Sequence, residues 1–303
     1  MTIKHPELTT VRDFIRYATS RFHQEGLYFG HGTDNAWDEA STLILHTLSL
    51  PHHIPATALD AHLIQSERVR LLDLINQRIE KRIPVPYLTH EAWFASLPFY
   101  VDERVLIPRS PLAELIENQF STWINLEKTH RVLDLCTGSG CIAIACAKAL
   151  PSVQVDASDI SEAALAVAKI NVLRHHVEDQ VHLHQADLFH PLPPQKYDII
   201  ISNPPYVDQA DMATLPDEYR HEPQIGLMAG ELGLDFATKI LADAAPFLNP
   251  HGILIVEVGN SEQALSEKYP KVPFTWLEFE RGGGGVFLLT AEEVHAHKAS
   301  FQT

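Results

Sequence analysis

The last two thirds of the chain alternate between short apolar runs and helical patterns, and this order constrains the fold more than any other feature. The apolar runs are rich in β-branched side chains, as in Tyr197–Ser202. Regular alternation of strand and helix predicts a parallel, doubly wound α/β sheet with helices on both faces. We expect seven strands, at 132–135, 153–157, 181–184, 197–202, 252–258, 276–280 and 285–289, with helices at 141–149, 162–173 and within 233–247.

The first part of the chain has a different texture, because its apolar residues recur at helical spacing. Residues 84–109 then hold four prolines between short aromatic runs, which predicts a hairpin connector with strands near 93–94, 99–101 and 105–107. The expected parts are a helical domain at 1–83, a β-hairpin connector at 84–109, an α/β domain at 110–290 and a frayed polar tail at 291–303. The helical stripes are Val11, Phe14, Ile15, Ala18 and Phe22, then Leu43, Ile44, Thr47 and Leu48, then Val69, Leu72, Ile75 and Ile79.

A loop at 28–36 separates the first two helical stripes. Gly30 and Gly32 mark the loop, and Asp34 or Asn35 can cap the helix that follows. Capping alone explains much of this pattern, although a functional loop is the alternative.

The composition indicates neither a membrane protein nor a secreted one. Charge or proline breaks every apolar run before it reaches membrane-span length, and Met1–Thr10 has no basic segment followed by an apolar one. The three cysteines lack zinc-site spacing, and none of the 18 histidines has a carboxylate or cysteine at metal-ligand spacing. We expect a cytoplasmic protein without a metal site, in which Cys136, Cys141 and Cys146 are small packing residues.

The formal net charge of −16 is unevenly spread along the chain. Residues 1–90 hold 9 Lys and Arg against 10 Asp and Glu, whereas residues 91–303 hold 14 against 29. The later part therefore has a net charge of −15. Such a surface repels nucleic-acid phosphates and attracts basic proteins, so the charge disfavours DNA or structured RNA as a direct substrate.

A glycine turn, Asp134-Leu-Cys-Thr-Gly138-Ser-Gly140, joins the first expected strand to its helix. Glycines let the backbone approach a ligand closely, and the helix amino terminus offers N–H groups to an anion. Asp159 follows the second strand, where an acidic side chain can accept hydrogen bonds from both ribose hydroxyls. Asp187 follows the third strand, where it can meet an adenine amino group. Helix capping is the alternative role for these acids and applies best to Asp187.

The same turn also fits a dinucleotide fingerprint, because Gly138-Ser-Gly140-Cys-Ile-Ala143 reads G-x-G-x-x-A. A nicotinamide dehydrogenase is therefore an alternative. Asp134 argues against it, because this acid can hold the ammonium of an amino-acid-like cofactor. Asp187 adds an acid at a third strand end, and the fourth strand ends in residues that offer nothing to a hydride donor.

An Asn-Pro-Pro-Tyr sequence, Asn203 to Tyr206, directly follows the expected strand 197–202. Two prolines end the strand and remove two backbone donors, at the strand end where open α/β sheets bind ligands. Asn203 Oδ1 and the Pro204 carbonyl could accept both hydrogens of a planar NH2 group while Tyr206 packs on its flat face. A strand-ending turn without chemistry is the alternative. Glu257, at another strand end, could orient this loop, although a structural role is the simpler interpretation.

These motifs, in this order, resemble the class I S-adenosylmethionine-dependent methyltransferases. The Asn-Pro-Pro-Tyr sequence is similar to that of enzymes that methylate planar nitrogens, among them DNA adenine and protein glutamine methyltransferases. The helical first part, the connector, Leu106–Arg109 and His221-Glu222-Pro223 resemble the protein-glutamine family over essentially the whole chain. Arg109-Ser110-Pro111 departs from the Arg-Pro-x-Thr-Glu of release-factor enzymes, and Phe29–Ala36 resembles the branch that modifies the third large-subunit ribosomal protein.

The resemblance implies a seven-stranded Rossmann-like fold, S-adenosyl-L-methionine as cofactor and S-adenosyl-L-homocysteine as product. It implies a basic large-subunit ribosomal protein as partner, free or early in assembly and selected by the helical domain, with no DNA or membrane bound. The residues implied for the cofactor are Asp134, Thr137, Gly138, Gly140, Asp159, Asp187, Leu188 and Asn203, and those implied for catalysis are Asn203, Pro204, Pro205 and Tyr206.

Three alternatives stay open on the sequence alone. Methylation of release factors is one, because no physical property of the motifs separates the two protein substrates. A DNA adenine methyltransferase would need a basic recognition region, and the first ninety residues are nearly neutral. A non-catalytic assembly factor that binds S-adenosylmethionine as a structural ligand is disfavoured by the intact residues Asn203 to Tyr206.

Overall fold

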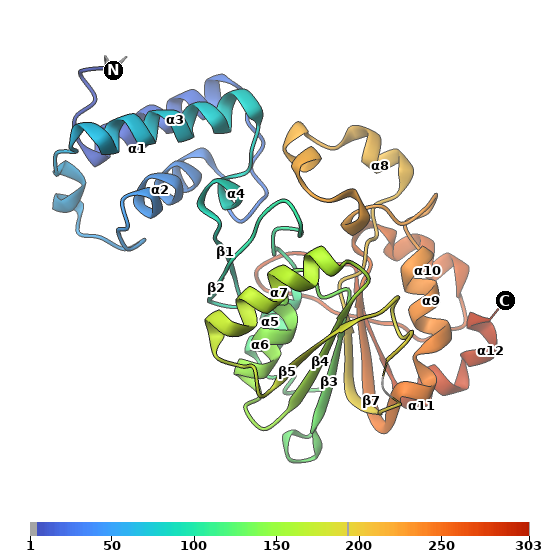
Figure 1. Ribbon diagram of the computed structural model, residues 1–303. Helices are drawn as coiled ribbons and strands as arrows, with labels where there is room; N and C mark the ends of the chain where they lie inside the picture. The colour runs from blue at the N-terminus through green and yellow to red at the C-terminus, as the bar shows by residue number, and fades with distance from the viewer. Residues whose placement is uncertain (1–4, 193, 303) are drawn as a thin grey trace. The chain divides into compact units, whose positions relative to one another are not determined.

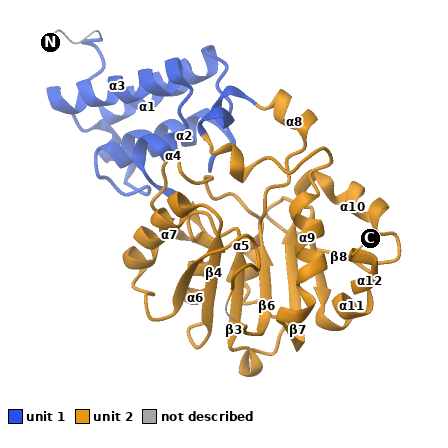
Figure 2. Cartoon of the chain, turned by 45° about the vertical axis from the view of Figure 1, so that its right-hand side comes forward, with its two compact units in different colours: residues 1–92, 216–221 blue, residues 93–215, 222–303 orange. Residues whose placement is uncertain are grey.

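The computed structural model describes residues 5–192 and 194–302, which fold into two compact units (Figure 1; Figure 2). The first unit comprises Met1–Ala92 and Pro216–His221, and the second comprises Trp93–Leu215 and Glu222–Thr303. The chain therefore passes between the units three times. The first four residues of the amino-terminal stretch 1–10, and the last residue of the expected tail, lie outside the described residues.

The first unit is helical, as the sequence predicts. A capping box formed by Thr10 and Asp13 starts the first helix, and Asn35 accepts a hydrogen bond from the Asp38 N–H to start the second. The described elements of this unit are α1 Val11–Gln24, α2 Ala36–Thr47, the 3-10 turn η1 Ala56–Asp60, α3 Gln65–Lys81, α4 Val85–Thr89 and the 3-10 turn η3 Asp217–His221.

The apolar stripes predicted for the first unit form its core in part, since Leu43 and Ile44 of the second stripe are buried but Thr47 and Leu48 are not. All five stripe residues of α1 are buried. On α3, Ile75 and Ile79 are buried, but Leu71 takes the place expected for Val69 and Leu72. The buried face of α3 is displaced from the predicted one because it also includes the stem and head of Arg78.

Arg78 fixes the separate segment 216–221 within the first unit. Its Nε donates to Glu39 Oε1 at 2.6 Å and its Nη1 to Glu218 Oε1 at 3.0 Å. The Tyr28 carbonyl accepts from Nη2 at 2.8 Å. All three charged side chains are about 1–2% exposed. Removing either carboxylate would leave a buried guanidinium without its partner, which is costly.

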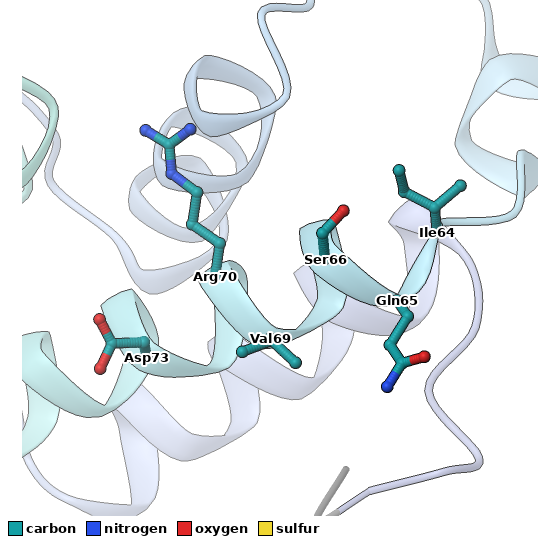
Figure 3. Close-up of a pocket in the computed structure, with 6 residues that line it drawn as sticks. All are labelled: Ile64, Gln65, Ser66, Val69, Arg70 and Asp73. Atoms are coloured by element: carbon teal, nitrogen blue, oxygen red, sulfur yellow. The ribbon is translucent and has the colours of Figure 1, made fainter. Parts of the chain in front are cut away.

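A shallow hollow of about 850 Å³ runs along the outer side of α3 (Figure 3). One arginine and one aspartate are its charged groups, and the other lining side chains are apolar or uncharged polar. No motif from the sequence falls in it. Its lining is Ile64, Gln65, Ser66, Val69, Arg70 and Asp73.

The second unit is built on a seven-stranded sheet within the described residues, in the order β5-β4-β3-β6-β7-β9-β8. The expected fold class is therefore confirmed. The strand β6 has the limits that the sequence predicts, and the others differ by a few residues. The strands of this sheet are β3 Arg131–Leu135, β4 Gln154–Asp159, β5 Val181–Gln185, β6 Tyr197–Ser202, β7 Leu248–Glu257, β8 Thr275–Trp276 and β9 Val286–Thr290.

The sheet is mixed, so the expectation of a purely parallel sheet is wrong at one edge. Strands β5, β4, β3, β6 and β7 are parallel, but β9 is antiparallel to both β7 and β8. The segment between β8 and β9, residues 277–285, is too short for a crossover helix. A turn returns the chain, and β9 inserts beside β7.

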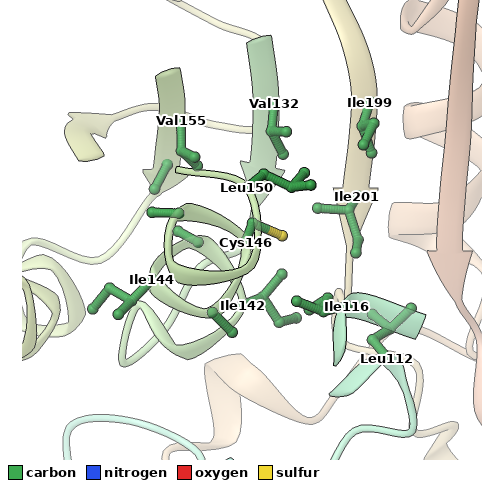
Figure 4. Packing of buried hydrophobic residues seen from close by; sticks show 14 of the residues in the cluster. Leu112, Ile116, Val132, Ile142, Ile144, Cys146, Leu150, Val155, Ile199 and Ile201 are labelled. Atoms are coloured by element: carbon green, nitrogen blue, oxygen red, sulfur yellow. The ribbon is translucent and has the colours of Figure 1, made fainter. Parts of the chain in front are cut away.

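Period-two alternation distributes the sheet residues between two cores. Val132, Ile199 and Ile201 pack under α5 and α6, and Leu133 and Ile200 pack on the opposite face. Figure 4 shows side chains of α5 and α6 against the first set. The helices of the unit are α5 Leu112–Glu117, α6 Cys141–Ala149, α7 Glu162–His175, α8 Gln209–Thr214, α9 Asp235–Asp243, α10 Glu262–Lys268, α11 Ala291–Ala296 and α12 Lys298–Phe301, and the 3-10 turns are η2 Leu126–Lys128, η4 Gln224–Gly226, η5 Ala245–Phe247 and η6 Gly259–Ser261.

The connector is only partly as expected. A hairpin is present, formed by β1 Ala92–Phe94 and β2 Leu97–Phe99. Residues 105–107 are not a strand, which corrects that expectation. The Ile107 N–H donates to Glu222 Oε1 at 2.9 Å and so has no role in a sheet ladder.

The expected frayed tail at 291–303 is wrong over the described residues. Thr290 and Glu293 form a capping box that starts α11, and α12 follows directly. Val294 and Phe301 are buried in the core under α9. One apolar anchor on each of these two short helices, the first of which has a capping box, holds this polar segment against the core.

The three cysteines are unpaired thiols. Cys141 and Cys146 are buried in α6, as expected of packing residues, and Cys136 is partly buried in the glycine turn. None of the helices within the described residues has the length and apolar content needed to cross a membrane.

Candidate active site

The glycine turn follows β3 in the centre of the sheet. Gly138 and Gly140 have positive φ, and Gly140 starts α6. A Cβ on Gly140 would lie 3.2 Å from the Cβ of Ala168, whereas a Cβ on Gly138 would meet nothing within 4 Å. Gly140 is therefore required by conformation and packing, and Gly138 faces open space.

Asp134 lies beneath this turn and is fully buried. Its Oδ2 accepts from Thr137 Oγ1 at 2.5 Å and from the Ala143 N–H at 3.2 Å. Its Oδ1 has no hydrogen-bond partner within the described residues. Burial raises the pKa of Asp134 to about 7, because a charged carboxylate is poorly solvated there. Such an unpaired buried oxygen is well suited to a cationic donor.

Asp159 ends β4 beside the turn. Its Oδ2 accepts from the Gly138 N–H and its Oδ1 from the Ser161 N–H, both at 2.9 Å. Burial raises the pKa of Asp159, although these backbone hydrogen bonds oppose the rise. The two N–H groups leave further lone pairs on the carboxylate for other donors.

Asp187 and Leu188 form a tight turn after β5. The Asp187 and His190 backbones exchange two hydrogen bonds of 2.8 and 3.0 Å. Asp187 is exposed, and its side chain caps no helix of the described chain. Leu188 has positive φ, buries its side chain and accepts a hydrogen bond from Ser158 Oγ at its carbonyl. The capping alternative for Asp187 is therefore wrong.

Asn203 comes directly after β6, which lies next to β3. Ser202 Oγ donates to the Leu135 carbonyl at 2.8 Å, so the ends of the two strands are held together. Asn203 is partly exposed, and its amide forms no hydrogen bond with a described residue. The Pro204 carbonyl, next along the chain, is likewise without a donor among the described residues. Two acceptors thus remain open side by side in sequence.

Tyr206 is held more tightly than Asn203. Its hydroxyl donates to Glu257 Oε1 at 3.0 Å. A Cβ on Gly259 would lie 2.5 Å from the Tyr206 ring, so only glycine fits beside it. Ser261 Oγ donates to the Tyr206 carbonyl at 3.3 Å. The residue is therefore fixed at both its backbone and its hydroxyl.

Glu257 is the last residue of β7 and is 4% exposed. Besides Tyr206, it accepts from Ser110 Oγ at 2.5 Å. Burial raises the pKa of Glu257, and the two hydroxyl donors and the nearby charge of Arg109 oppose the rise. The hydrogen bond to Tyr206 favours the alternative in which Glu257 orients the loop after β6 over a purely structural role.

A second buried carboxylate, Glu222, holds the other side of the connector. Arg109 donates to both of its oxygens, at 2.6 and 2.8 Å. The Ile107 N–H is a third donor. The connector segment 107–110 is thus fastened to the loop after β6 and to the end of β7.

Two groups of residues therefore meet at the carboxyl ends of adjacent strands β5, β4, β3 and β6. We call Asp134–Gly140 with Asp159, Asp187 and Leu188 the glycine-turn half. We call Asn203–Tyr206, with its supports Ser110, Glu222 and Glu257, the Asn-Pro-Pro-Tyr half. The sequence motifs indicate the first half almost completely, but they do not indicate that Ser110 meets Glu257. The local signal for it is a serine before Pro111, whose Oγ accepts a hydrogen bond from the Leu112 N–H at the start of α5.

Comparison with known proteins agrees with this geometry. The family model described as Methyltransferase small domain matches residues 115–216. The ribosomal protein uL3 glutamine methyltransferase of Francisella tularensis subsp. tularensis (strain SCHU S4 / Schu 4) is 47% identical, over 97% of this chain and 94% of its own length. Those of Neisseria meningitidis serogroups A and B are each 51% identical, over 95% of this chain and 95% of their own.

Among solved structures, the catalytic domain of hMettl16 in complex with the MAT2A 3′UTR hairpin 6 has a TM-score of 0.50 and 19% identity to this chain. The similarity covers 78% of this chain and 86% of that chain. It shows the methyltransferase fold and nothing of the substrate. The uL3 relatives are similar enough, and over enough of both chains, to decide the family. The chain belongs to the ribosomal protein uL3 glutamine methyltransferases.

Proposed function

We propose that the protein transfers a methyl group from S-adenosyl-L-methionine to the side-chain amide nitrogen of a glutamine in ribosomal protein uL3. The names of its relatives support the substrate. One structural observation carries the amide chemistry: Asn203 Oδ1 and the Pro204 carbonyl are neighbouring acceptors without partners among the described residues. A dehydrogenase, a DNA methyltransferase and a non-catalytic assembly factor have no such support.

S-Adenosyl-L-methionine is the methyl donor, and the glycine-turn half fits it. The unpaired Oδ1 of Asp134 would hold the ammonium group. Asp159 would accept hydrogen bonds from the ribose hydroxyls with its remaining lone pairs, and the open space at Gly138 leaves room for a ligand. Asp187 and the backbone of Leu188 would meet the adenine. When bound, the cofactor supplies an electrophilic methyl group on a positively charged sulfur.

The residues of the Asn-Pro-Pro-Tyr half would make the amide nitrogen reactive. An amide nitrogen is a poor nucleophile, because its lone pair is shared with the carbonyl. Asn203 Oδ1 and the Pro204 carbonyl would each accept one N–H and so aim the lone pair at the methyl group. The same acceptors stabilise positive charge as it grows on nitrogen. Positioning of this kind can supply roughly 7–11 kcal/mol in favourable cases.

No general base is needed for this reaction. The nitrogen keeps both hydrogens until the new N–C bond has replaced the S–C bond of the donor, and one proton of the strongly acidic nitrogen then passes to solvent water. Pro205 keeps the loop rigid by its fixed φ, and Tyr206 covers the flat face of the amide. Each of these residues acts by position and by accepting hydrogen bonds.

The charge of the chain favours a free basic protein as substrate. Residues 91–303 carry a net charge of −15, which attracts a basic ribosomal protein before its charge is neutralised by RNA. Mature subunits present phosphates that this surface repels. We therefore place methylation before assembly or early in it.

The first unit would select the partner. Its 28–36 loop leads into α2, and the loop and the first turn of α2 present the exposed aromatic side chains Tyr28 and Trp37, at 42% and 46% exposure. Asp34 and Asp38 are exposed in the same segment. Aromatic side chains with acidic neighbours are suited to a basic protein surface.

The test compares methylation of isolated uL3 with that of mature large subunits, using labelled S-adenosylmethionine at several salt concentrations. We expect one labelled glutamine on free uL3, little label on the subunit, and an association rate that falls as salt rises. Replacing each glutamine of uL3 by asparagine identifies the site.

A release factor serves as the comparison substrate. Label on the release factor and not on uL3 would transfer the chain to the other protein-glutamine substrate. Equal rates on free and assembled uL3, or rates independent of salt, would disprove the electrostatic part of the proposal and leave the chemistry of Asn203 untouched.

A further inference from the structure

The residues around Tyr206 hold it at more points than a strand-ending turn requires. Only glycine at 259 leaves room for the Tyr206 ring. A Cβ on Gly233 would likewise collide with the Tyr206 carbonyl. Ser261 Oγ lies 3.3 Å from this carbonyl oxygen and 3.1 Å from the Leu232 carbonyl oxygen, and the two acceptors share its one hydrogen. The backbone of Tyr206 therefore has little freedom, and its ring orientation depends on what holds the hydroxyl.

Glu257 is the group that holds the hydroxyl. Both of its oxygens accept from O–H donors, one from Tyr206 and one from Ser110. A carboxylate engaged at both oxygens cannot rotate without losing a hydrogen bond. Its neighbouring cation, Arg109, donates to Glu222 and to the Ile107 carbonyl instead. Burying a carboxylate with hydroxyl donors and no direct cation is unfavourable for folding, which points to a role in the site.

Ser110 fixes Glu257 in turn. Its Oγ donates to Glu257 Oε2 and accepts from the Leu112 N–H at 3.1 Å. The hydrogen-bonded chain therefore runs from the first turn of α5 through Ser110 and Glu257 to Tyr206. It joins three segments that lie far apart in the sequence. They meet at the carboxyl ends of the strands, where Asn203 leaves its acceptors open.

We propose that Glu257, held by Ser110, is the positioning residue that sets the ring of Tyr206 for the substrate amide. This inference rests on the proposed function, because the ring matters only if a flat amide lies against it. Glu257 does not touch the reacting atoms. It acts through one hydroxyl, so removing that hydroxyl makes Glu257 irrelevant to turnover.

The test is a double-mutant cycle on the full chain with uL3 as substrate. Tyr206→Phe removes the hydroxyl, and Glu257→Leu removes the carboxylate with nearly conserved volume. We expect each to lower kcat by roughly 10- to 100-fold with little change in the Kd of S-adenosylmethionine. The double variant should be no slower than the slower single variant, because both changes break the same contact. Glu257→Gln, which still accepts at one oxygen, should recover much of the rate.

Asp156 and Tyr197 offer a matched control. Asp156 is a buried carboxylate on β4 that accepts from the Tyr197 hydroxyl at 3.1 Å, in the same sheet but outside the site. Asp156→Asn and Tyr197→Phe should lower the midpoint of thermal unfolding and leave kcat and KM for uL3 within about twofold.

The outcomes separate the two levels of the inference. Multiplicative losses for Tyr206→Phe and Glu257→Leu would refute the positioning role, as would a kcat loss of the same size in the Asp156 control. A wild-type chain that labels no glutamine of uL3 would instead refute the proposed function, whatever the variants do.

Discussion

The two halves of the candidate active site are built in different ways. In the glycine-turn half, Asp134, the turn and Asp159 lie within 26 residues of one another and are joined by backbone N–H groups. In the Asn-Pro-Pro-Tyr half, Tyr206 depends on Glu257 and Ser110, and the connector depends on Glu222. The first half is local, and the second is assembled from distant parts of the chain.

The two halves also present different chemical groups to a ligand. The glycine-turn half presents N–H groups and buried carboxylates, as expected for a ligand with a cationic amino-acid end and a ribose. The Asn-Pro-Pro-Tyr half presents open acceptors on a loop that the two carboxylates Glu222 and Glu257 hold in place. Changes in the first half should therefore alter cofactor affinity, and changes in the second should alter turnover or the stability of the loop.

The largest effect is expected from Asn203→Ala. Loss of one acceptor for the substrate amide should cost on the order of 3 kcal/mol in the transition state, or about 100-fold or more in kcat. The Asn203 side chain forms no hydrogen bond with a described residue, so folding and the Kd of S-adenosylmethionine should stay near wild type. Turnover with uL3 and calorimetry with the cofactor measure the two quantities. Turnover close to wild type would remove Asn203 from the mechanism.

Asp159→Ala should act on the other half. It should weaken S-adenosylmethionine binding by about 2–3 kcal/mol, because charge-assisted hydrogen bonds to both ribose hydroxyls are lost. At saturating cofactor, kcat should recover most of its wild-type value, in contrast to Asn203→Ala. An unchanged dissociation constant in calorimetry would mean that Asp159 serves only to hold the Gly138 and Ser161 N–H groups.

The contrast between the halves also explains what the sequence could predict. The limits of α6, the cap at Ser161 and the strand β6 follow from local signals such as glycine, capping residues and β-branched runs. These signals need only neighbours in the chain. The local structure of the glycine turn could therefore be predicted from the sequence alone, and the binding roles of its residues stay predictions.

Contacts over long sequence separation could not be predicted in this way. Ser110 and Glu257 are 147 residues apart, and Ile107 and Glu222 are 115 apart. The stretch 105–107 has the composition of a strand, yet the Ile107 N–H donates to the Glu222 carboxylate and not to a neighbouring strand. The antiparallel β9 depends likewise on which strand edge is free once β7 is in place.

The expectation of a frayed tail at 291–303 fails for a different reason, because this segment does contain local signals for a helix. Thr290 and Glu293 fit a capping box, and the apolar residues Val294 and Phe301 are seven residues apart. The expectation of a frayed tail follows from the polar composition of 291–303 and takes no account of these signals. A terminal segment needs few apolar anchors when a core is already there to receive them.

Glu222→Gln should sharpen the comparison at the level of stability. The variant keeps the shape of the side chain but removes the charge that Arg109 contacts with both of its terminal nitrogens. We expect the free energy of unfolding to fall by about 1–3 kcal/mol, because Glu222 is buried and accepts three hydrogen bonds. Urea unfolding measures it. Arg12→Gln, which breaks the exposed pair with Asp60, is the control and should change little.

The last effect concerns the proton on Asp134. Its pKa is raised to about 7 in the folded chain, above the 3.8 of an unperturbed aspartate, so the folded state holds a proton that the unfolded state releases between these values. Without ligand, the contribution of Asp134 to stability should therefore fall as pH rises from about 4 to 7. A bound ammonium favours the charged carboxylate and reverses this preference.

Cofactor binding at pH 7 should then release about half a proton from Asp134, and affinity should strengthen as pH rises through 7. Calorimetry in buffers of different ionisation enthalpy measures the release. Asp134→Asn should abolish it, weaken binding and flatten the pH dependence of stability, because the amide does not titrate. Asp159→Ala, which leaves Asp134 in place, should weaken binding without abolishing the release. If wild type exchanged no proton on binding, Asp134 would be only a scaffold for Thr137 and Ala143, and the ammonium would be held elsewhere in the glycine-turn half.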